Sequence, residues 1–312
     1  MSLQRNNLTV KLMDNELKQN GKTGAALKSM RLRTLPLSLA GVLIGAKLAW
    51  RVWQVNPSVI VLLALTTVSL QILSNLSNEL GDVLHGTDTE DRQGPAYGLN
   101  SGALTVKDMK RLIAGAAACC VVFGTAMVWL SFGTLLCLPS VLLLLLGAGA
   151  IAAAVKYTLG KNPYGYRAGG DFWVFVFFGL VSVLGAYFVC CHRMDDWSLV
   201  LPAAGIGFFS IGVLNVNNIR DMKTDAPNRV TVALKLGLKN ARIYQTVLVC
   251  LGWACLIAYT LMHFSSPWRL LYLLTLPLYY IHLKGVWANT GRTLDKYLPM
   301  LVMSTFMLAL LY

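Results

Sequence analysis

The stretch Asn75-Leu-Ser-Asn-Glu-Leu-Gly-Asp-Val-Leu-His-Gly-Thr-Asp-Thr-Glu-Asp-Arg92 ends a long apolar run that begins near Val59. Five of the chain's 14 acidic residues lie within it: Glu79, Asp82, Asp88, Glu90 and Asp91. Carboxylates at the end of a membrane-like helix are energetically costly, which marks them as candidates for a functional site. We therefore expect this stretch to hold a positively charged species.

The composition of the whole chain is that of a membrane protein. The chain has 312 residues, of which 56% are hydrophobic and 13% charged, whereas about 25% of residues are charged in a soluble globular protein. Several apolar runs are long enough to cross the hydrocarbon core of a bilayer, while a β-barrel would show shorter alternating segments of about 10 residues. The sequence predicts an all-α polytopic membrane protein with nine transmembrane helices in a single bundle around a lipid-accessible cavity. The nine predicted spans lie near residues 33–50, 58–78, 111–131, 134–155, 171–191, 198–217, 243–263, 267–286 and 297–312.

The distribution of the basic residues predicts how the chain crosses the membrane. Residues 1–30 are polar and basic and are expected to form a cytoplasmic tail, followed by one nine-helix domain over residues 31–312. The loops after spans two, four, six and eight carry most of the remaining Lys and Arg, whereas the opposite loops hold only Arg51, Arg193 and Arg269. This asymmetry is the positive-inside rule, so the net charge of +13 reflects topology rather than nucleic-acid binding. We expect a protein of the cell inner (plasma) membrane with its N-terminus cytoplasmic and its C-terminus outside.

Three features near the first span and in the loops bear on structure or function. Arg31 and Arg33 precede the first span, where they could anchor it at the head groups or contact an anion. Gly41-x-x-x-Gly45 in that span would allow another helix to approach closely. Residues 158–171 concentrate glycine, tyrosine and cations, which fits either an anion-binding loop or an ordinary interfacial loop.

A second apolar run ends in a similar polar pattern about 140 residues after the first. At helical spacing, one face of each run carries its polar residues: Asn75, Asn78 and Asp82 in the first, and Asn218, Asp221 and Asp225 in the second. Paired half-sites of this kind occur in membrane proteins built from internal repeats. We therefore expect the two helix ends to face one site.

The types of ligand at these helix ends favour a hard cation. Carboxylate and amide oxygens, without Cys or His, suit Mg²⁺, which leaves room for phosphate oxygens in its coordination shell. Carboxylates alone would repel a diphosphate, whereas carboxylates that carry Mg²⁺ would attract one. Several cations could complete a diphosphate pocket: Arg92, Lys156, Arg167, Lys223 and Arg229.

A magnesium–diphosphate site beside apolar helices favours chemistry on a lipid diphosphate. The metal would stabilise the leaving diphosphate so that an allylic C–O bond can ionise, and the apolar spans would hold the isoprenoid tail away from water. A cation-coupled transporter is the alternative from another class. It would predict charged or helix-breaking residues near mid-membrane, whereas these acids gather at helix ends on one side.

The same residues resemble the UbiA superfamily of intramembrane aromatic prenyltransferases, and within it the branch that acts on 1,4-dihydroxy-2-naphthoate in menaquinone biosynthesis. The resemblance runs from about residue 28 to the end of the chain. The matching pieces are Arg31-Leu-Arg-Thr-Leu-Pro-Leu-Ser38, Gln71-Ile-Leu-Ser-Asn-Leu-Ser-Asn78, Gly81-Asp82, Gly86-x-Asp88-x-x-Asp91-Arg92-x-Gly-Pro95, Tyr157-Thr158, Pro163-Tyr-Gly-Tyr-Arg167, Gly170-Asp171, Asn217-Asn-Ile-Arg-Asp221-x-x-x-Asp225, Thr231 and Leu236-Gly237. No single motif is specific for the family, but the order and spacing of all of them together are specific for it.

The resemblance implies a nine-helix bundle with a lateral, lipid-facing opening and a Mg²⁺ site on the cytoplasmic side. It implies transfer of a polyprenyl group from polyprenyl diphosphate to dihydroxynaphthoate, with loss of CO₂, to give demethylmenaquinone. No obligate protein partner is expected. The residues expected at the metal are Asn78, Glu79, Asp82, Asp88, Asp91, Asp221 and Asp225, of which Asp82, Asp221 and Asp225 are the catalytic candidates. Those expected at the substrates are Asn78, Arg92, Lys156, Tyr157, Tyr164, Arg167, Asn218 and Arg229.

The chain departs from the family pattern at two places. Glu79 stands where an aspartate is expected, so that carboxylate is displaced by about one methylene. Residues 226–230 (Ala-Pro-Asn-Arg-Val) replace a usual Gly-Lys pair, which transfers the anion contact there to Arg229. Within the superfamily, 4-hydroxybenzoate is the alternative acceptor, although the Pro-Tyr-Gly-Tyr-Arg and Asp-Arg-x-Gly-Pro loops favour the naphthoate branch.

Overall fold

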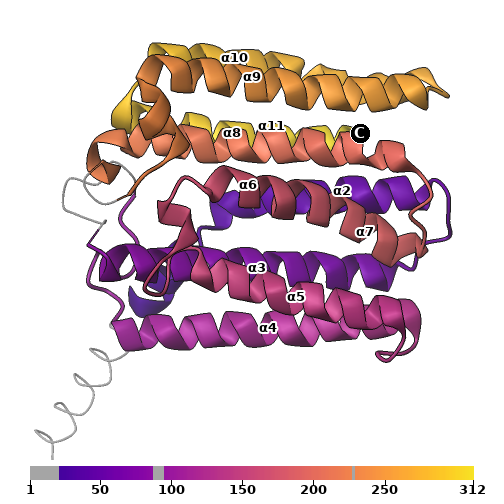
Figure 1. Cartoon of the computed structure of the whole chain (residues 1–312), viewed down its shortest axis with the longest axis horizontal. Helices are drawn as coiled ribbons and strands as arrows, with labels where there is room; N and C mark the ends of the chain where they lie inside the picture. The colour runs from indigo at the N-terminus through magenta and orange to yellow at the C-terminus, as the bar shows by residue number, and fades with distance from the viewer. Residues whose placement is uncertain (1–20, 87–94, 227–228) are drawn as a thin grey trace, which may run out of the picture.

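The computed structural model of the chain describes residues 21–86, 95–226 and 229–312. They form a bundle of long helices that lie roughly parallel or antiparallel to one another (Figure 1). The α-helices are α2 (Leu35–Trp50), α3 (Pro57–Leu84), α4 (Val106–Phe132), α5 (Leu138–Lys156), α6 (Gly170–Val174), α7 (Ser182–Cys191), α8 (Val200–Asp225), α9 (Val232–Met262), α10 (Leu276–Ala288) and α11 (Tyr297–Leu311). The 3₁₀ segments are η1 (Leu32–Thr34), η2 (Tyr164–Tyr166), η4 (Trp197–Leu199), η5 (Pro267–Thr275) and η6 (Gly291–Leu294), and η3 (Phe175–Val181) is a π-helix.

The all-α, membrane-spanning architecture predicted from the sequence is confirmed. Among the described residues, eight helices are long and apolar enough to cross a membrane, counting Gly170–Cys191 as one continuous helix through α6, η3 and α7. The span expected at 267–286 is divided between η5 and the 13-residue α10, so no single α-helix of sufficient length covers it. The count of nine spans therefore stays a prediction.

Local sequence signals explain several helix starts and contacts. Thr105 and Asp108 form a capping box at the start of α4, because the Thr105 hydroxyl accepts from the Asp108 amide and the Asp108 carboxylate accepts from the Thr105 amide. Gly41 and Gly45 in α2 face α7 so closely that a Cβ on either glycine would collide with Ser182 or Val183. The close helix approach predicted from these two glycines is confirmed.

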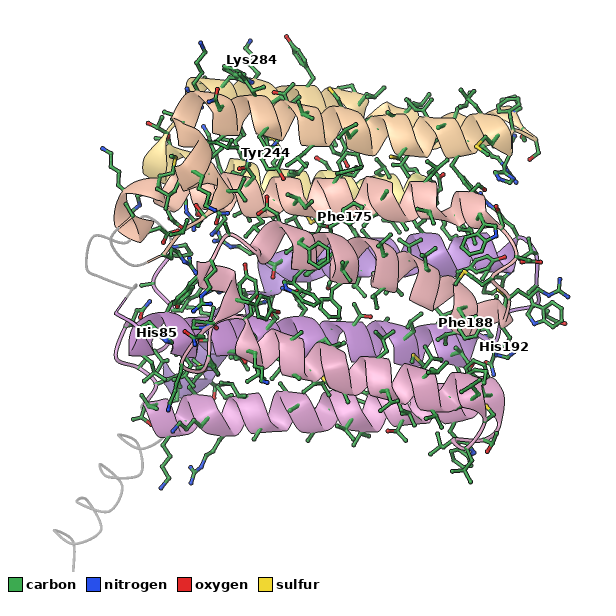
Figure 2. All side chains as sticks on the ribbon, in the orientation of Figure 1. His85, Phe175, Phe188, His192, Tyr244 and Lys284 are labelled. Carbon is green, nitrogen blue, oxygen red and sulfur yellow. The ribbon has the colours of Figure 1, made fainter. Side chains whose placement is uncertain are left out.

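The two ends of the bundle differ. The connections that follow α3, α5 and α8 lie at one end, which we call the polar end, and the C-terminus lies at the other (Figure 1). His85 marks the polar end and His192 the opposite end in Figure 2. Residues 21–29 are helical and bury Ala25 in a small core with Leu76, Leu80, Leu104 and Met109. The first described residues therefore pack against α3 and α4 at the polar end.

Candidate active site

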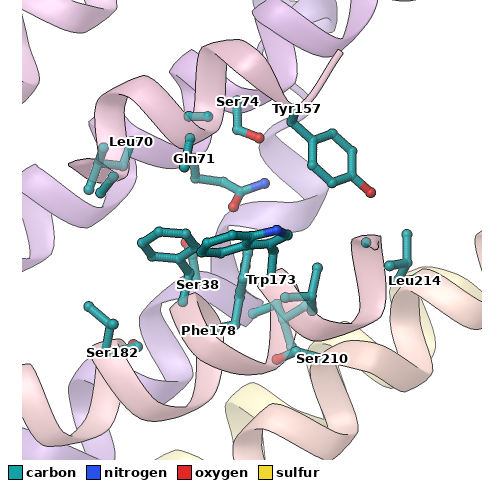
Figure 3. Close-up of a pocket in the computed structure, with 18 of the residues that line it drawn as sticks. Ser38, Leu70, Gln71, Ser74, Tyr157, Trp173, Phe178, Ser182, Ser210 and Leu214 are labelled. Atoms are coloured by element: carbon teal, nitrogen blue, oxygen red, sulfur yellow. The ribbon is translucent and has the colours of Figure 1, made fainter. Parts of the chain in front are cut away.

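A cavity of about 400 Å³ opens between α2, α3, α5, α8 and the helix formed by α6, η3 and α7. Towards the polar end its walls carry amides, carboxylates and the guanidiniums of Arg31 and Arg229. Farther along α3 and α5 the walls become apolar, as at Leu63, Leu70 and Leu146. Figure 3 shows Gln71, Ser74 and Tyr157 on one side of this cavity, and Phe178, Ser182 and Ser210 on the other. The cavity therefore joins a charged head region to an apolar extension.

The polar face predicted on α3 lines the head region of the cavity. Asn75, Asn78 and Asp82 all contribute to its wall, as helical spacing required. Asn75 also donates to the carbonyl of Met30 at 2.9 Å and to the hydroxyl of Thr34 at 3.1 Å, which ties α3 to the segment before α2. The prediction that these residues share one face of α3 is confirmed, and their functional role stays a prediction.

Glu79, although adjacent in sequence, lies outside this wall. Its side chain is fully buried, and Oε1 accepts a hydrogen bond from the backbone N–H of Leu99 at 2.7 Å. The carboxylate thus holds the loop before α4 against α3. This contact is a structural one, and the metal role expected for Glu79 stays a prediction.

Arg229 joins the acidic ends of α3 and α8. Its guanidinium lies 3.4 Å from Asp82 Oδ1 and 3.5 Å from Asp225 Oδ2. Asp82 also accepts a hydrogen bond from the Tyr166 hydroxyl at 2.8 Å, and the Arg229 guanidinium stacks 4.7 Å from the centre of the Tyr166 ring. Among the described residues, Arg229 is therefore a positive group that contacts the acidic ends of both α3 and α8.

Two loops that are distant in sequence bring Arg229 to this position. The Ala168 N–H donates to the Val230 carbonyl at 2.8 Å, and the Val230 N–H donates to the Tyr166 carbonyl at 3.0 Å. This short parallel pairing sets Tyr166 and Arg229 side by side above the cavity. Because backbone hydrogen bonds fix both partners, the guanidinium has a defined position between the two carboxylates.

Close packing of the α5–α6 loop against α3 orients Asn78. Thr158 donates to the Ser77 carbonyl at 2.9 Å and to Asn78 Oδ1 at 3.2 Å. A Cβ at Gly81 would lie 2.5 Å from the Thr158 Cβ, so only glycine permits this approach. With its oxygen accepting from Thr158, the Asn78 amide is held at the cavity wall.

Asp221 has a different environment from the other residues of its predicted face. Arg220 is buried, and its Nε and Nη2 donate to the Asp221 carboxylate at 2.8 Å and 2.6 Å. Its Nη1 donates to Asp295 at 2.7 Å. Arg33 pairs with the same Asp295 at 3.2 Å. Asn218 lines the cavity, whereas Asp221 and Asp225 lie outside its wall, and Asp225 contacts the lining residue Arg229. The α8 face is therefore divided between the cavity and this ionic network.

The remaining predicted site residues fall into three groups. Tyr157 and Tyr164 line the cavity. Lys156 and Arg167 are exposed and lie outside its wall, and Arg167 donates to the Asn162 side chain at 2.7 Å. Asp88, Asp91 and Arg92 lie outside the described residues.

The structure adds cavity residues to which the sequence had assigned no role. A row of rings runs from the head region into the apolar part: Tyr157 to Tyr164 at 5.2 Å between centroids, Tyr164 to Trp173 at 5.5 Å, and Trp173 to Phe177 at 5.7 Å. Trp173 and Phe177 are four residues apart, a spacing that could have indicated a shared helical face. Asp171, also at the cavity wall, accepts from the Tyr244 hydroxyl at 2.9 Å.

Electrostatics keep the loop groups of the head region in single protonation states. Burial alone would lower the pKa of Arg229, but the carboxylates of Asp82 and Asp225 outweigh it and raise that pKa above its ordinary value. Burial also raises the pKa of Tyr157 to about 12. At neutral pH the head region thus presents a permanent guanidinium and an uncharged phenol.

The donor atoms of the head region fit a hard cation. Asn78, Asp82, Asn218 and Asp225 offer only oxygen or amide groups, which suits Mg²⁺ rather than a softer metal. Within the described ranges, no three His, Cys, Asp or Glu side chains gather into a ready metal site. Arg229 occupies the space between two of the carboxylates, so a metal would have to share or replace its contacts.

The chain is similar to known proteins over most of its length. Residues 38–305 match the model of the UbiA prenyltransferase family. A 1,4-dihydroxy-2-naphthoate octaprenyltransferase of Escherichia coli (strain K12) is 40% identical over 83% of this chain and 84% of its own. The protein of the same name from Mycobacterium tuberculosis (strain ATCC 25618 / H37Rv) is 36% identical over 80% of this chain and 81% of its own.

Solved structures show the same fold. The apo structure of a UbiA homolog from Aeropyrum pernix K1 superposes with a TM-score of 0.65 at 18% identity, covering 88% of this chain and 96% of that one. The family match and the relatives agree with the resemblance carried by the acidic helix ends. The chain belongs to the UbiA prenyltransferase family, and it is a multi-pass membrane protein.

Proposed function

We propose that this protein transfers a polyprenyl group from an all-trans polyprenyl diphosphate to 1,4-dihydroxy-2-naphthoate. The C–O bond between the prenyl group and diphosphate breaks, a C–C bond forms at the aromatic ring, and diphosphate and CO₂ leave, giving the demethylmenaquinone skeleton. The observation that carries the proposal is the cavity itself, because it joins a charged head region to an apolar extension. The names of the similar proteins supply the aromatic acceptor.

The head region would hold the diphosphate. Arg229 offers a guanidinium that stays charged and matches phosphate geometry, and Asn78 and Asn218 offer amide groups at the same wall. Asp82 and Asp225 would hold Mg²⁺, which when bound would neutralise the diphosphate and make it a better leaving group. With Mg²⁺ held by Asp82 and Asp225, the guanidinium of Arg229 would be free to donate to the phosphate oxygens.

The apolar part of the cavity would hold the prenyl chain. Its walls between α2, α3 and α5 consist mainly of aliphatic side chains and small residues such as Ala150 and Ala154. Each buried methylene of an isoprenoid stabilises the complex by about 0.8 kcal/mol. The same walls exclude water from the reacting carbon, which protects an allylic cation from hydrolysis.

The row of aromatic rings lies where positive charge would develop. Tyr157, Tyr164 and Trp173 stand between the head region and the apolar extension, so their faces border the first prenyl carbon. An aromatic face attracts a cation by about 0.5–2 kcal/mol, more when the site is dry. The rings would also stack on the naphthalene of the acceptor and align its nucleophilic carbon.

The positive-inside distribution supports a definite orientation. The polar end, with the loops that follow α3 and α8, would face the cytoplasm of a bacterial-type inner membrane, where both diphosphate and aromatic acid are water-accessible. The first described residues lie at the polar end and the C-terminus at the other (Figure 1). This arrangement agrees with a cytoplasmic N-terminus and an outside C-terminus.

The proposal is tested by supplying membranes that contain the protein with polyprenyl diphosphate and one acceptor at a time. We expect prenylated product with 1,4-dihydroxy-2-naphthoate, together with stoichiometric CO₂ and diphosphate. Membranes with an Asp82→Asn variant serve as the control for background enzymes. Product with 4-hydroxybenzoate and none with the naphthoate would instead assign the enzyme to another acceptor within the family.

A further inference from the structure

A second cavity of about 400 Å³ lies at the end of the bundle opposite the polar end. The end of α2, the α7–α8 connection, the end of α9 and η5 form its walls. We call it the far-end pocket and define it by its charged and titratable residues, which are Arg51, Arg193, Asp195, Asp196, His263 and Arg269. It shares no lining residue with the cavity proposed for prenyl transfer.

The arginines of the far-end pocket have donors to spare. Within the described residues no ion pair joins any of the three to an Asp or Glu side chain. Arg51 donates to the backbone oxygen of Tyr312 at 2.6 Å, and Arg269 donates to the carbonyl of His263. The Arg193 guanidinium lies over the ring of Trp53, 4.8 Å from its centre. Each guanidinium has five N–H donors, so most remain available to an anion.

The two carboxylates of the far-end pocket differ in their engagement. Asp196 accepts from the Ser198 N–H at 2.9 Å and from the Ser198 hydroxyl at 2.5 Å, and lies 3.6 Å from His263 Nε2. Asp195 forms no hydrogen bond or ion pair with any described residue. The far-end pocket thus offers a group of cations and, beside them, one carboxylate that is free to accept from a cation.

The level of the far-end pocket in the membrane follows from its surroundings. It lies where four membrane-spanning helices begin or end, and exposed tryptophans are adjacent in sequence to its lining residues: Trp50 (55% exposed), Trp53 (45%), Trp197 (82%) and Trp268 (76%). Tryptophan is enriched at the membrane–water interface because its ring is apolar and its N–H is polar. The far-end pocket therefore lies among the lipid head groups.

We propose that the far-end pocket binds one phospholipid whose head group carries both a phosphodiester and a primary ammonium. Arg51 and Arg269 would hold the phosphate, since guanidinium N–H groups match phosphate oxygens in geometry and charge. Asp195 would accept from the ammonium. The acyl chains would leave along the apolar surface of the helices, so this lipid would be bound at a site separate from the prenyl substrate.

The experiment measures lipid retention by native mass spectrometry of the full chain, reconstituted with phosphatidylethanolamine, phosphatidylcholine or phosphatidylglycerol. We expect one tightly retained phosphatidylethanolamine per chain. Phosphatidylcholine should be retained about tenfold less, because its methylated ammonium has no N–H to donate and a charged hydrogen bond is worth about 1.5–3 kcal/mol. Inorganic phosphate at high concentration should not displace the lipid, because it lacks both ammonium and acyl chains.

Variants assign the retained lipid to the far-end pocket. The double variant Arg51→Gln/Arg269→Gln should lose retention of every phospholipid by about tenfold or more. Asp195→Asn should keep retention and lose the preference for phosphatidylethanolamine over phosphatidylcholine. Lys284→Gln removes a charge from an exposed site outside both cavities and is the matched control. Prenyl transfer in detergent and the thermal unfolding midpoint verify that each variant is folded.

Several results would overturn the proposal. They are equal retention of the three lipids by the unmodified protein, a preference for phosphatidylglycerol, displacement by inorganic phosphate, or a double variant that behaves as Lys284→Gln does. If the double variant does not fold, Asp195→Asn alone decides, because an unchanged lipid preference in that variant excludes the ammonium contact. None of these outcomes depends on which aromatic acid the enzyme prenylates.

Discussion

Arg229 donates a hydrogen bond to Asp82 at 3.4 Å across a separation of 147 residues in the chain. The same guanidinium contacts Asp225 at 3.5 Å, so one cation joins the two acidic helix ends. Buried carboxylates are stable in such a position only if a positive charge accompanies them. If a metal and a diphosphate bind here as proposed, the contacts of Arg229 would have to change.

Replacing Arg229 with glutamine is expected to weaken diphosphate binding. The variant removes the charge but keeps two N–H donors, so initial rates against polyprenyl diphosphate concentration should show kcat/KM lowered about tenfold to a hundredfold. Arg229→Lys should recover part of this loss, since it restores the charge without the planar geometry. An Arg229→Gln enzyme with unchanged kcat/KM would exclude the diphosphate contact.

Tyr166 is expected to orient Asp82 through its hydroxyl and Arg229 through its ring. Tyr166→Phe removes the 2.8 Å hydrogen bond to Asp82 and keeps the ring, so we expect activity to fall by about tenfold. Tyr166→Ala also removes the ring 4.7 Å from the guanidinium and should be more severe. The matched control is Tyr164→Phe, whose hydroxyl contacts only the Ala153 carbonyl among the described residues. Equal rates for the two phenylalanine variants would contradict this role.

Asp221→Asn is expected to abolish turnover while leaving expression and folding intact. Although Asp221 is paired with Arg220 in the resting structure, it lies one helical turn from Asn218 and Asp225 on α8. Asp295→Asn is the control, because Asp295 binds the same Arg220 but lies just after η6 and outside the cavity wall. Rates are compared at equal protein levels in membranes. Near-normal activity of Asp221→Asn would remove Asp221 from the catalytic set.

Removal of divalent metal is expected to stop prenyl transfer. Chelation with EDTA leaves Asp82 and Asp225 paired with Arg229, and the diphosphate then lacks the charge that makes it a leaving group. Added Mg²⁺ should restore the rate in a saturable manner, with Ca²⁺ less effective because it prefers a larger and looser coordination shell. Full activity in the presence of EDTA would refute the magnesium assignment.

Filling the apolar part of the cavity is expected to shorten the accepted prenyl chain. Ala150 lines the cavity on α5, whereas Ala152 on the same helix is exposed and lies outside it. Ala150→Phe should lower the rate with long polyprenyl diphosphates more than with geranyl diphosphate, because the ring occupies space needed by distal isoprene units. Competition between the two donors measures this preference, and Ala152→Phe should leave it unchanged. The same shift in both variants would argue against a chain in this part of the cavity.

Much of the architecture was predictable because its causes are local. Runs of apolar residues predicted the long helices, and Gly41 and Gly45 predicted the close approach of another helix, which is α7. Helical spacing also predicted that Asn75, Asn78 and Asp82 would share a face of α3, and all three line the cavity. Each of these features depends on residues within a few turns of one another.

Helical spacing and residue charge were not sufficient to predict the side-chain contacts at the end of α8 and in the loops. Spacing alone placed Asn218, Asp221 and Asp225 on one face, but Asp221 pairs with Arg220, whose guanidinium also binds Asp295 from another part of the chain. Likewise Lys156 and Arg167 had the right charge, yet their side chains lie outside the cavity wall, while Arg229 lies within it. Which cation faces the carboxylates depends on how the loops pair, and no spacing rule contains that pairing.

The sequence by itself determined the class of the protein, its membrane character and the two acidic helix ends, because hydrophobicity, charge and helical period act over short distances. The tertiary structure decided that Arg229 and Tyr166 meet Asp82, that a row of rings leads into an apolar cavity, and that a second charged pocket lies at the far end. These contacts join residues that are far apart in the chain. Only the packing of helices and loops brings them within hydrogen-bonding distance.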